Sequence, residues 1–151
     1  MELVRGDLDS ADVVALLHEH LADMAADTPP ESVHALGLEE LRRPEVTFWS
    51  LRDGEDLLGC GALKEIETGH GEIKSMRTAE AHLRKGVAGT LLRQILAEAR
   101  ARGYRRVSLE TGASADFAAA QALYRRFGFV DCAPFGDYRE DPYSRYMTLE
   151  I

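Results

Sequence analysis

The clearest indication of the fold comes from residues 71–103, GEIKSMRTAEAHLRKGVAGTLLRQILAEARARG. The stretch begins as a short strand, passes through a basic turn that contains two glycines, and ends as an amphipathic helix. Apolar residues recur along this helix at the spacing of one face, and Gly103 follows them as a stop signal. The apolar stripe comprises Val87, Leu91, Leu92, Ile95, Leu96 and Ala99. A strand that leads directly into such a helix is typical of an α/β protein.

The turn at residues 83–89 has the composition of an anion-binding site. A helix N-terminus leaves about four backbone N–H groups without partners and carries roughly half a positive charge. Glycines let a phosphate approach the backbone, and Arg84 and Lys85 add full charges. The sequence therefore predicts a phosphate-bearing ligand here, although an ordinary turn with solvated basic residues has the same composition. The expected contacts are Arg84, Lys85, Gly86, Val87, Ala88, Gly89 and Thr90.

Strands and helices alternate on both sides of this stretch. The pattern predicts strands over residues 3–5, 46–52, 57–66, 72–78, 105–110, 129–133 and 144–151. It predicts helices over residues 11–26 and 116–127, besides the one that ends at Gly103, and one or two short helices within 31–43. His18 and His20 are expected to decorate the outside of the first helix. We expect one domain, residues 1–151, with an α/β layer structure built on a mixed sheet.

Composition narrows the class of function. The chain has 151 residues, of which 18 are basic and 26 acidic, so its formal charge is −8. This balance argues against nucleic acid as the main partner. Two cysteines without metal-ligand spacing indicate reduced thiols in a cytoplasmic protein, and no histidine has metal spacing with another ligand. Neither a signal peptide nor a run of about 20 apolar residues is present, so no membrane is expected.

A second motif follows the glycine turn. The pattern A-x-x-L-Y-x-x-x-G-F occupies residues 120–129. Together with the strand, the basic turn and the long helix, it resembles the GNAT family of N-acetyltransferases over essentially the whole chain. The resemblance implies a mixed, splayed sheet of about seven strands with about four helices. Two positions depart from the family pattern: Leu83 replaces an Arg or Gln, and Phe117 stands where an Asn is often found.

The chain also resembles a bacterial subgroup of this family, whose members are often labelled indole-acetate acetyltransferases. It shares the motif P-P-E-S-x-H, here residues 29–34, and an Asp-Pro loop near the C-terminus, here residues 134–144. We expect the first segment to cover the acceptor pocket, with Glu31, Ser32 and His34 as substrate contacts.

The resemblance implies acetyl-CoA as co-substrate. Its pyrophosphate would lie on the N–H groups of residues 84–90, and its pantetheine arm would pair with the free backbone of Met76, Arg77 and Thr78 where the sheet splays. A backbone N–H near Met76 can then stabilise the oxyanion. Tyr124 is the candidate proton donor for the leaving thiolate. It also belongs to an apolar helical stripe, so a purely structural role stays open.

An amine acceptor must lose a proton, which calls for a base. Glu72 and Glu110 stand on neighbouring strands and are the two carboxylate candidates, with His34 as a third. Charged residues at strand ends are more often solvated than catalytic, so the alternative is that these carboxylates simply face the solvent. The function expected is transfer of an acetyl group to a small-molecule amine. A catalytically silent acyl-CoA sensor and an enzyme acting on a protein N-terminus or lysine are the alternatives, and a homodimer stays open.

Overall fold

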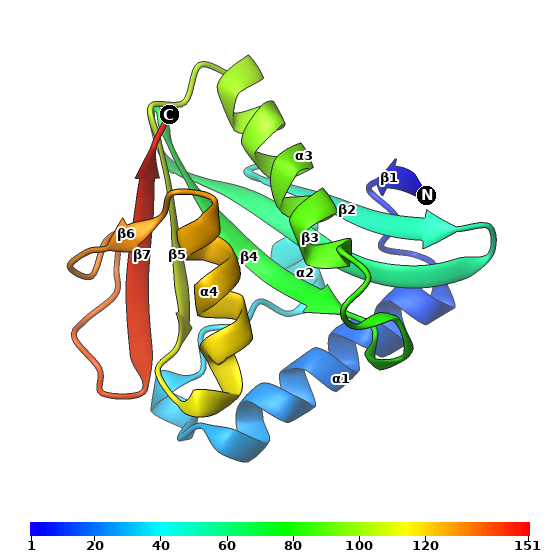
Figure 1. Ribbon diagram of the computed structural model, residues 1–151, viewed down its shortest axis with the longest axis horizontal. Helices are drawn as coiled ribbons and strands as arrows, with labels where there is room; N and C mark the ends of the chain where they lie inside the picture. Colours follow the sequence, from blue (N-terminus) through cyan, green and yellow to red (C-terminus); the bar gives the residue numbers. More distant parts are fainter.

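The computed structural model describes residues 1–151, except for the side chain of Asp27. Its strands form one seven-stranded sheet in the order β1-β2-β3-β4-β5-β7-β6 (Figure 1). Within the described chain, only β4 and β5 pair in parallel, and the mixed sheet expected from the sequence is confirmed. The strands are β1 (Glu2–Arg5), β2 (Val46–Asp53), β3 (Asp56–Glu67), β4 (His70–Thr78), β5 (Arg106–Gly112), β6 (Val130–Asp131) and β7 (Ser144–Glu150).

The helices are α1 (Ala11–Asp27), α2 (Leu38–Leu41), α3 (Val87–Ala101) and α4 (Ala118–Arg126). Three 3-10 turns accompany them, at Pro30–Ser32, Glu80–His82 and Ala115–Phe117. The segment 31–43 holds a 3-10 turn and the four-residue α2, because the extended backbone of Gly37 (ψ 175°) separates them. The strand expected over 129–133 shrinks to the two residues of β6.

The two faces of the sheet are covered by different helices. Alternation along the strands sends Trp49 and Leu63 to one face, where α3 and α4 pack, and Phe48 and Ala62 to the other, where α1 and α2 pack. The apolar stripe of α3 is buried over its whole length, as the 3.6-residue spacing predicts.

The feature that positions the site is a divergence between β4 and β5. Their parallel ladder ends at the pair Ile73 and Leu109, although β4 continues to Thr78 and β5 to Gly112. Figure 1 shows β4 swinging away from β5 below this point, with α4 in front of the gap. The irregular register between β3 and β4 lies beside Ser75, whose φ of 55° is left-handed. Such a bulge bends and twists its strand, which explains the separation.

Candidate active site

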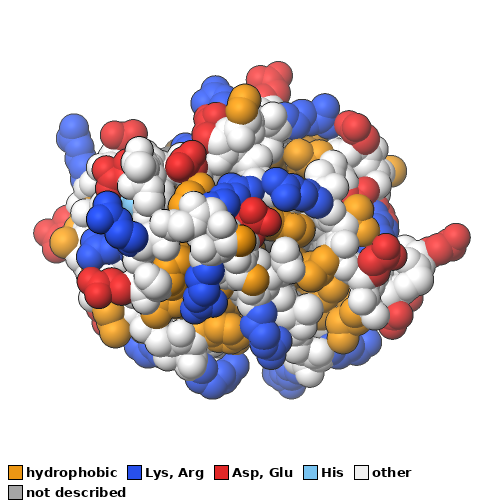
Figure 2. All heavy atoms as spheres, turned by 90° about the horizontal axis from the view of Figure 1, so that it is seen from above, with side chains coloured by type: hydrophobic (Ala, Val, Ile, Leu, Met, Phe, Trp, Pro, Cys, Tyr) orange, Lys and Arg blue, Asp and Glu red, His pale blue; other side chains and the backbone are white. Residues whose placement is uncertain are grey.

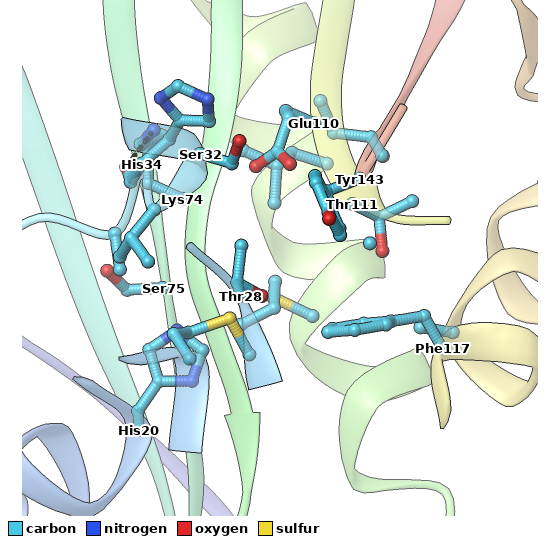
Figure 3. Close-up of a pocket in the computed structure, with 18 of the residues that line it drawn as sticks. His20, Thr28, Ser32, His34, Lys74, Ser75, Glu110, Thr111, Phe117 and Tyr143 are labelled. Carbon is cyan, nitrogen blue, oxygen red and sulfur yellow. Dashed lines mark hydrogen bonds between the residues drawn. The ribbon is translucent and has the colours of Figure 1, made fainter. Parts of the chain in front are cut away.

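A cavity of about 130 Å³ lies at the point where β4 and β5 separate. Its walls come from α1, the segment after α1, the two strands and α4, and Figure 3 shows polar side chains from both sides facing one another across it. The apolar part of the lining includes Met24, Ile73, Leu109, Phe117 and Ala120. A concave, mostly enclosed space with a few convergent polar groups is the usual form of a small-molecule site.

Tyr124 of α4 lines this cavity and is 7 % exposed. Its ring packs edge-on against Phe129, at 5.8 Å between centroids, so the tyrosine belongs to the apolar core as well as to the cavity. Burial, with a smaller contribution from the charge of Glu110, raises the pKa of the Tyr124 phenol to about 12. The hydroxyl therefore holds its proton at neutral pH.

Glu110 lies near the end of β5 and lines the same cavity (Figure 3). Burial raises the pKa of its carboxyl group, and the charges of His34 and Lys74 oppose that rise. A carboxylate with a raised pKa beside a cavity is suited to accept a proton from an amine.

Glu72, the other carboxylate candidate, does not line this cavity. It is 5 % exposed and lines a neighbouring cleft of about 540 Å³ under the loop 136–141. The Tyr138 hydroxyl and the Lys74 ammonium both donate hydrogen bonds to Glu72 Oε2, the latter over 3.2 Å. Lys74 also donates to the Tyr138 hydroxyl at 2.8 Å and to the carbonyl oxygen of His34 at 2.9 Å. The network anchors Glu72 and leaves Glu110 as the cavity's carboxylate.

The segment that carries the P-P-E-S-x-H motif forms one wall of the cavity. Its three predicted substrate contacts, Glu31, Ser32 and His34, take different positions. Ser32 is buried, lines the cavity and donates a hydrogen bond from its hydroxyl to Asp141 in the C-terminal loop. His34 lines both the cavity and the cleft, and its ring lies edge-on to Tyr138 at 4.9 Å. Glu31 is exposed and lines only the cleft, because the 3-10 turn at Pro30–Ser32 directs neighbouring side chains to different sides.

The basic turn has the geometry of an anion site. Arg84 (φ 63°) and Gly86 (φ 79°) are both left-handed, and α3 begins directly after them. No heavy atom lies within 4 Å of the place where a Cβ of Gly86 would stand, so a bulky group has room there. The first N–H groups of the 15-residue helix follow directly and have no carbonyl partner within the helix. Leu83 is 54 % exposed and leaves the backbone groups of the turn accessible.

The structure brings to the cavity several residues that sequence reasoning missed. His20 of α1 is 9 % exposed, so the expectation that it decorates the outside of the helix is wrong. The signal was available, because His20 follows Leu16 and Leu17 by four and three residues and so continues their buried stripe. Ser75 and Thr111 carried no such signal, since only the divergence of the strands turns them towards a common space.

Phe117, which stands where the family often has an Asn, lines the cavity just before α4. Its ring occupies the space next to Gly112 so closely that a Cβ on Gly112 would overlap it. The aromatic ring and the glycine therefore depend on one another at this end of β5.

Other classes of site find no support in the described residues. No three His, Cys, Asp or Glu side chains of the described part of the chain gather as metal ligands would. None of the helices described is long and apolar enough to cross a membrane. On the face shown in Figure 2, several basic side chains lie over the lower part of the view, acidic ones lie mostly towards its margins, and apolar atoms are exposed between them.

Comparison with known sequences gives the family. The profile of the acetyltransferase (GNAT) family matches residues 13–129. The uncharacterized N-acetyltransferase YsnE of Bacillus subtilis is 57 % identical over 151 residues, which cover all of both chains. The IAA acetyltransferase of Azospirillum brasilense is 39 % identical over 142 residues, covering 93 % of this chain and 92 % of that protein.

Solved structures agree with this assignment. A Klebsiella pneumoniae protein described as an acyl-CoA N-acyltransferase superposes with a TM-score of 0.78 at 26 % identity, covering 99 % of this chain and 96 % of its own. A Bacillus subtilis acetyltransferase in complex with CoA superposes with a TM-score of 0.69 at 18 % identity, covering 99 % and 98 %. The matched family profile and the relatives of high identity over the full length show that the chain belongs to the acetyltransferase (GNAT) family.

Proposed function

We propose that this enzyme transfers the acetyl group of acetyl-CoA to the amine of a small molecule bound in the cavity between β4 and β5. The observation that carries the proposal is the cavity itself, which joins the edge of β4 that has lost its β5 partner, the hydroxyl of Tyr124 and the carboxylate of Glu110. Acetyl-CoA supplies an acetyl thioester when it is bound. The chain provides a phosphate site, a free strand edge and groups that move protons.

The turn before α3 would hold the pyrophosphate. Backbone N–H groups of residues 84–90 and the positive end of the helix favour an anion, and the charges of Arg84 and Lys85 add to them. The backbone of Met76, Arg77 and Thr78 lies beyond the last β4–β5 pair and would hydrogen-bond an extended pantetheine arm as a strand does. An N–H near Met76 would face the negative charge that develops on the acetyl oxygen.

Two side chains would handle the protons. Glu110 would accept the proton that the attacking amine loses as its nitrogen bonds to the acetyl carbon. Tyr124 would donate a proton to the departing thiolate as the carbon–sulfur bond breaks. Glu72 and His34 stay weaker candidates for the base, because the Glu72 carboxylate is engaged by Tyr138 and Lys74, and His34 packs on Tyr138 at the cavity rim.

The size of the site favours a small acceptor over a peptide. The cavity measures about 130 Å³, and the buried Ser32 with its hydrogen bond to Asp141 closes it on one side. A peptide substrate would need an open groove, which this closure obstructs. His34 and Ser32 would contact the acceptor, and Glu31 would act, if at all, from the adjoining cleft.

The test is release of free CoA from acetyl-CoA in the presence of a panel of small amines, with peptides bearing free N-termini and lysines beside them. We expect turnover with at least one small amine and none with the peptides. Peptide turnover alone would contradict the small-molecule acceptor, and CoA binding without any turnover would contradict the enzymatic assignment for this panel. Tyr124→Phe serves as the low-activity reference.

A further inference from the structure

One wall of the cavity carries two buried polar atoms without a protein partner among the described residues. His20 is 9 % exposed and its Nδ1 makes no hydrogen bond, and Ser75 is 7 % exposed and its Oγ makes none. Buried polar atoms are satisfied in the great majority of cases, and each exception calls for an explanation. Two exceptions on one wall of one cavity indicate a ligand group that bonds to both (Figure 3).

The backbone holds Ser75 in place. Its φ of 55° is left-handed, which is uncommon for a residue other than glycine, and such residues concentrate at functional sites. Its carbonyl oxygen accepts a hydrogen bond from the buried thiol of Cys60 at 3.3 Å. The bulge therefore fixes the backbone at Ser75 and the direction of its Cα–Cβ bond, which limits the positions that the hydroxyl can take.

The two walls of the cavity differ in charge. Burial, followed by the positive charge of Arg77, lowers the pKa of His20 to about 4, with Lys74 adding to the effect. The imidazole is therefore neutral at pH 7 and keeps one N–H to donate, and the Ser75 hydroxyl can donate as well. Across the cavity stands the carboxylate of Glu110, as Figure 3 shows. One side thus offers neutral hydrogen-bond donors, and the other offers a charged acceptor.

We propose that the acceptor is an amino acid, a small molecule that carries both a carboxylate and the amine to be acetylated. Its carboxylate would receive hydrogen bonds from His20 Nδ1 and Ser75 Oγ, and its amine would lie beside Glu110. Its side chain would contact the apolar lining at Met24 and Phe117. This inference rests on the proposed function and specifies the class of acceptor that the same cavity takes.

The experiment compares each of a set of L-amino acids with the amine that results from its decarboxylation, for example L-leucine with 3-methylbutylamine. CoA release is measured with wild-type enzyme. For at least one pair we expect kcat/KM to be tenfold or more higher for the amino acid. Equal or higher values for the amines throughout would overturn the inference and leave the proposed function intact.

Substitutions of His20 and Ser75 distinguish binding of the acceptor's carboxylate from a purely structural role of these two residues. Ser75→Ala and His20→Phe should each raise KM for the preferred amino acid about tenfold and leave KM for its matching amine unchanged. Ser50→Ala is the control, because Ser50 is also a buried serine but lies outside the cavity lining, where its hydroxyl donates a hydrogen bond to Asp7. If Ser75→Ala and His20→Phe instead weaken CoA binding and the preference persists, the pair serves the co-substrate and the inference is wrong.

A binding measurement decides the case without turnover. The same amino acids and amines are titrated calorimetrically into the CoA-saturated protein. Tighter binding of the amino acid, reduced by Ser75→Ala, supports the inference even where no acetylation occurs, and that absence of acetylation would count against the proposed function alone. Indistinguishable binding of the two series overturns the inference.

Discussion

At the scale of single residues, Tyr124 and Glu110 are coupled. Burial and the Glu110 charge together hold the Tyr124 pKa near 12, which makes the phenol a weak acid towards a thiolate whose own pKa lies near ~8.5. When Glu110 takes up the amine proton, its charge disappears, and so does its share of the rise in the Tyr124 pKa. In the proposed mechanism, deprotonation of the amine therefore prepares Tyr124 to donate.

Tyr124→Phe removes one oxygen and keeps the ring that packs on Phe129. If Tyr124 protonates the thiolate, kcat should fall by ~10²-fold or more, with little change in CoA affinity. The defect should shrink as the pH rises, because a thiolate leaves more readily without help at high pH. Steady-state kinetics from pH 6.5 to 9, with chemistry shown to limit the rate, check this. Full kcat at neutral pH would assign Tyr124 to the core alone.

Glu110 links the site to stability. Its pKa is raised in the folded state, so the fold favours the protonated carboxyl, and its ionisation as pH rises through the folded pKa lowers the free energy of unfolding. Glu110→Gln should therefore raise the melting temperature at pH 7, and the gain should shrink towards pH 4. Thermal melts across this range test it, with Glu2→Gln on the exposed start of β1 as control. A gain that is independent of pH would refute the linkage.

At the scale of elements, the proposed mechanism assigns the binding of CoA to the backbone of β4 and of the turn before α3. The β4 bulge at Ser75 frees a strand edge, and the left-handed Gly86 frees the first N–H groups of α3. Neither element depends on a specific side chain for these contacts, which explains how Leu83 can replace a polar residue in the turn.

Gly86→Asp places a carboxylate in the space proposed for the pyrophosphate. CoA affinity should fall tenfold or more, because ~1.4 kcal/mol of repulsion already amounts to one decade. Gly86→Asn is the matched control: Asn tolerates a positive φ about as well as Asp, without the charge. Calorimetry on both folded variants checks the prediction. Equal affinity of Gly86→Asp and wild type would place the phosphate elsewhere.

The segment at residues 29–34 provides the second test at this scale. His34→Ala should raise the acceptor KM several-fold and leave CoA affinity intact, since His34 lines the cavity. Glu31→Gln should have the smaller effect, because Glu31 lines only the adjoining cleft. The measurement is the KM for the acceptor and the KM for acetyl-CoA, determined for both variants and for wild type. A change confined to thermal stability would make the segment structural.

At the scale of the whole molecule, the α1 side of the sheet is closed by two segments far apart in sequence. The loop before β7 joins β4 through Tyr138, which donates to Glu72, and joins the segment after α1 through the Ser32–Asp141 hydrogen bond. Within this loop, Phe135 lies edge to face with Tyr138 and with Tyr146 of β7, and the rings of Tyr138 and Tyr146 are tilted by 50°. The cavity is therefore held by segments from both halves of the chain.

Tyr138→Phe tests this closure. It removes one of the two donors of the buried Glu72 carboxylate, and a lost hydrogen bond to a buried charged group costs about 1–3 kcal/mol. For a chain of this length the melting temperature should fall by roughly 2–4 °C per kcal/mol. Tyr143→Phe, at a residue that is 51 % exposed, should melt like wild type. An unchanged melting temperature for Tyr138→Phe would show that the loop contributes little.

Most of the helices and strands, and the turn proposed to bind phosphate, could be read from the sequence. The stripe of α3, the stop at Gly103 and the alternation of the strands depend on residues close together in the chain, and the structure confirms the mixed sheet they predict. The anion turn is equally local, since its N–H groups, glycines and charges all lie within seven residues.

The lining of the cavity could not be read from the sequence and follows from the tertiary structure. Glu72 and Glu110 looked equivalent on neighbouring strands, but the divergence of β4 from β5 and the loop carrying Tyr138 gave them different surroundings. Ser75 in the β4 bulge and His20 on α1 are 55 residues apart in sequence, and only the folded chain brings both to the same cavity. Such groupings depend on contacts between distant segments, which local spacing does not encode, because they are selected by the packing of the whole chain.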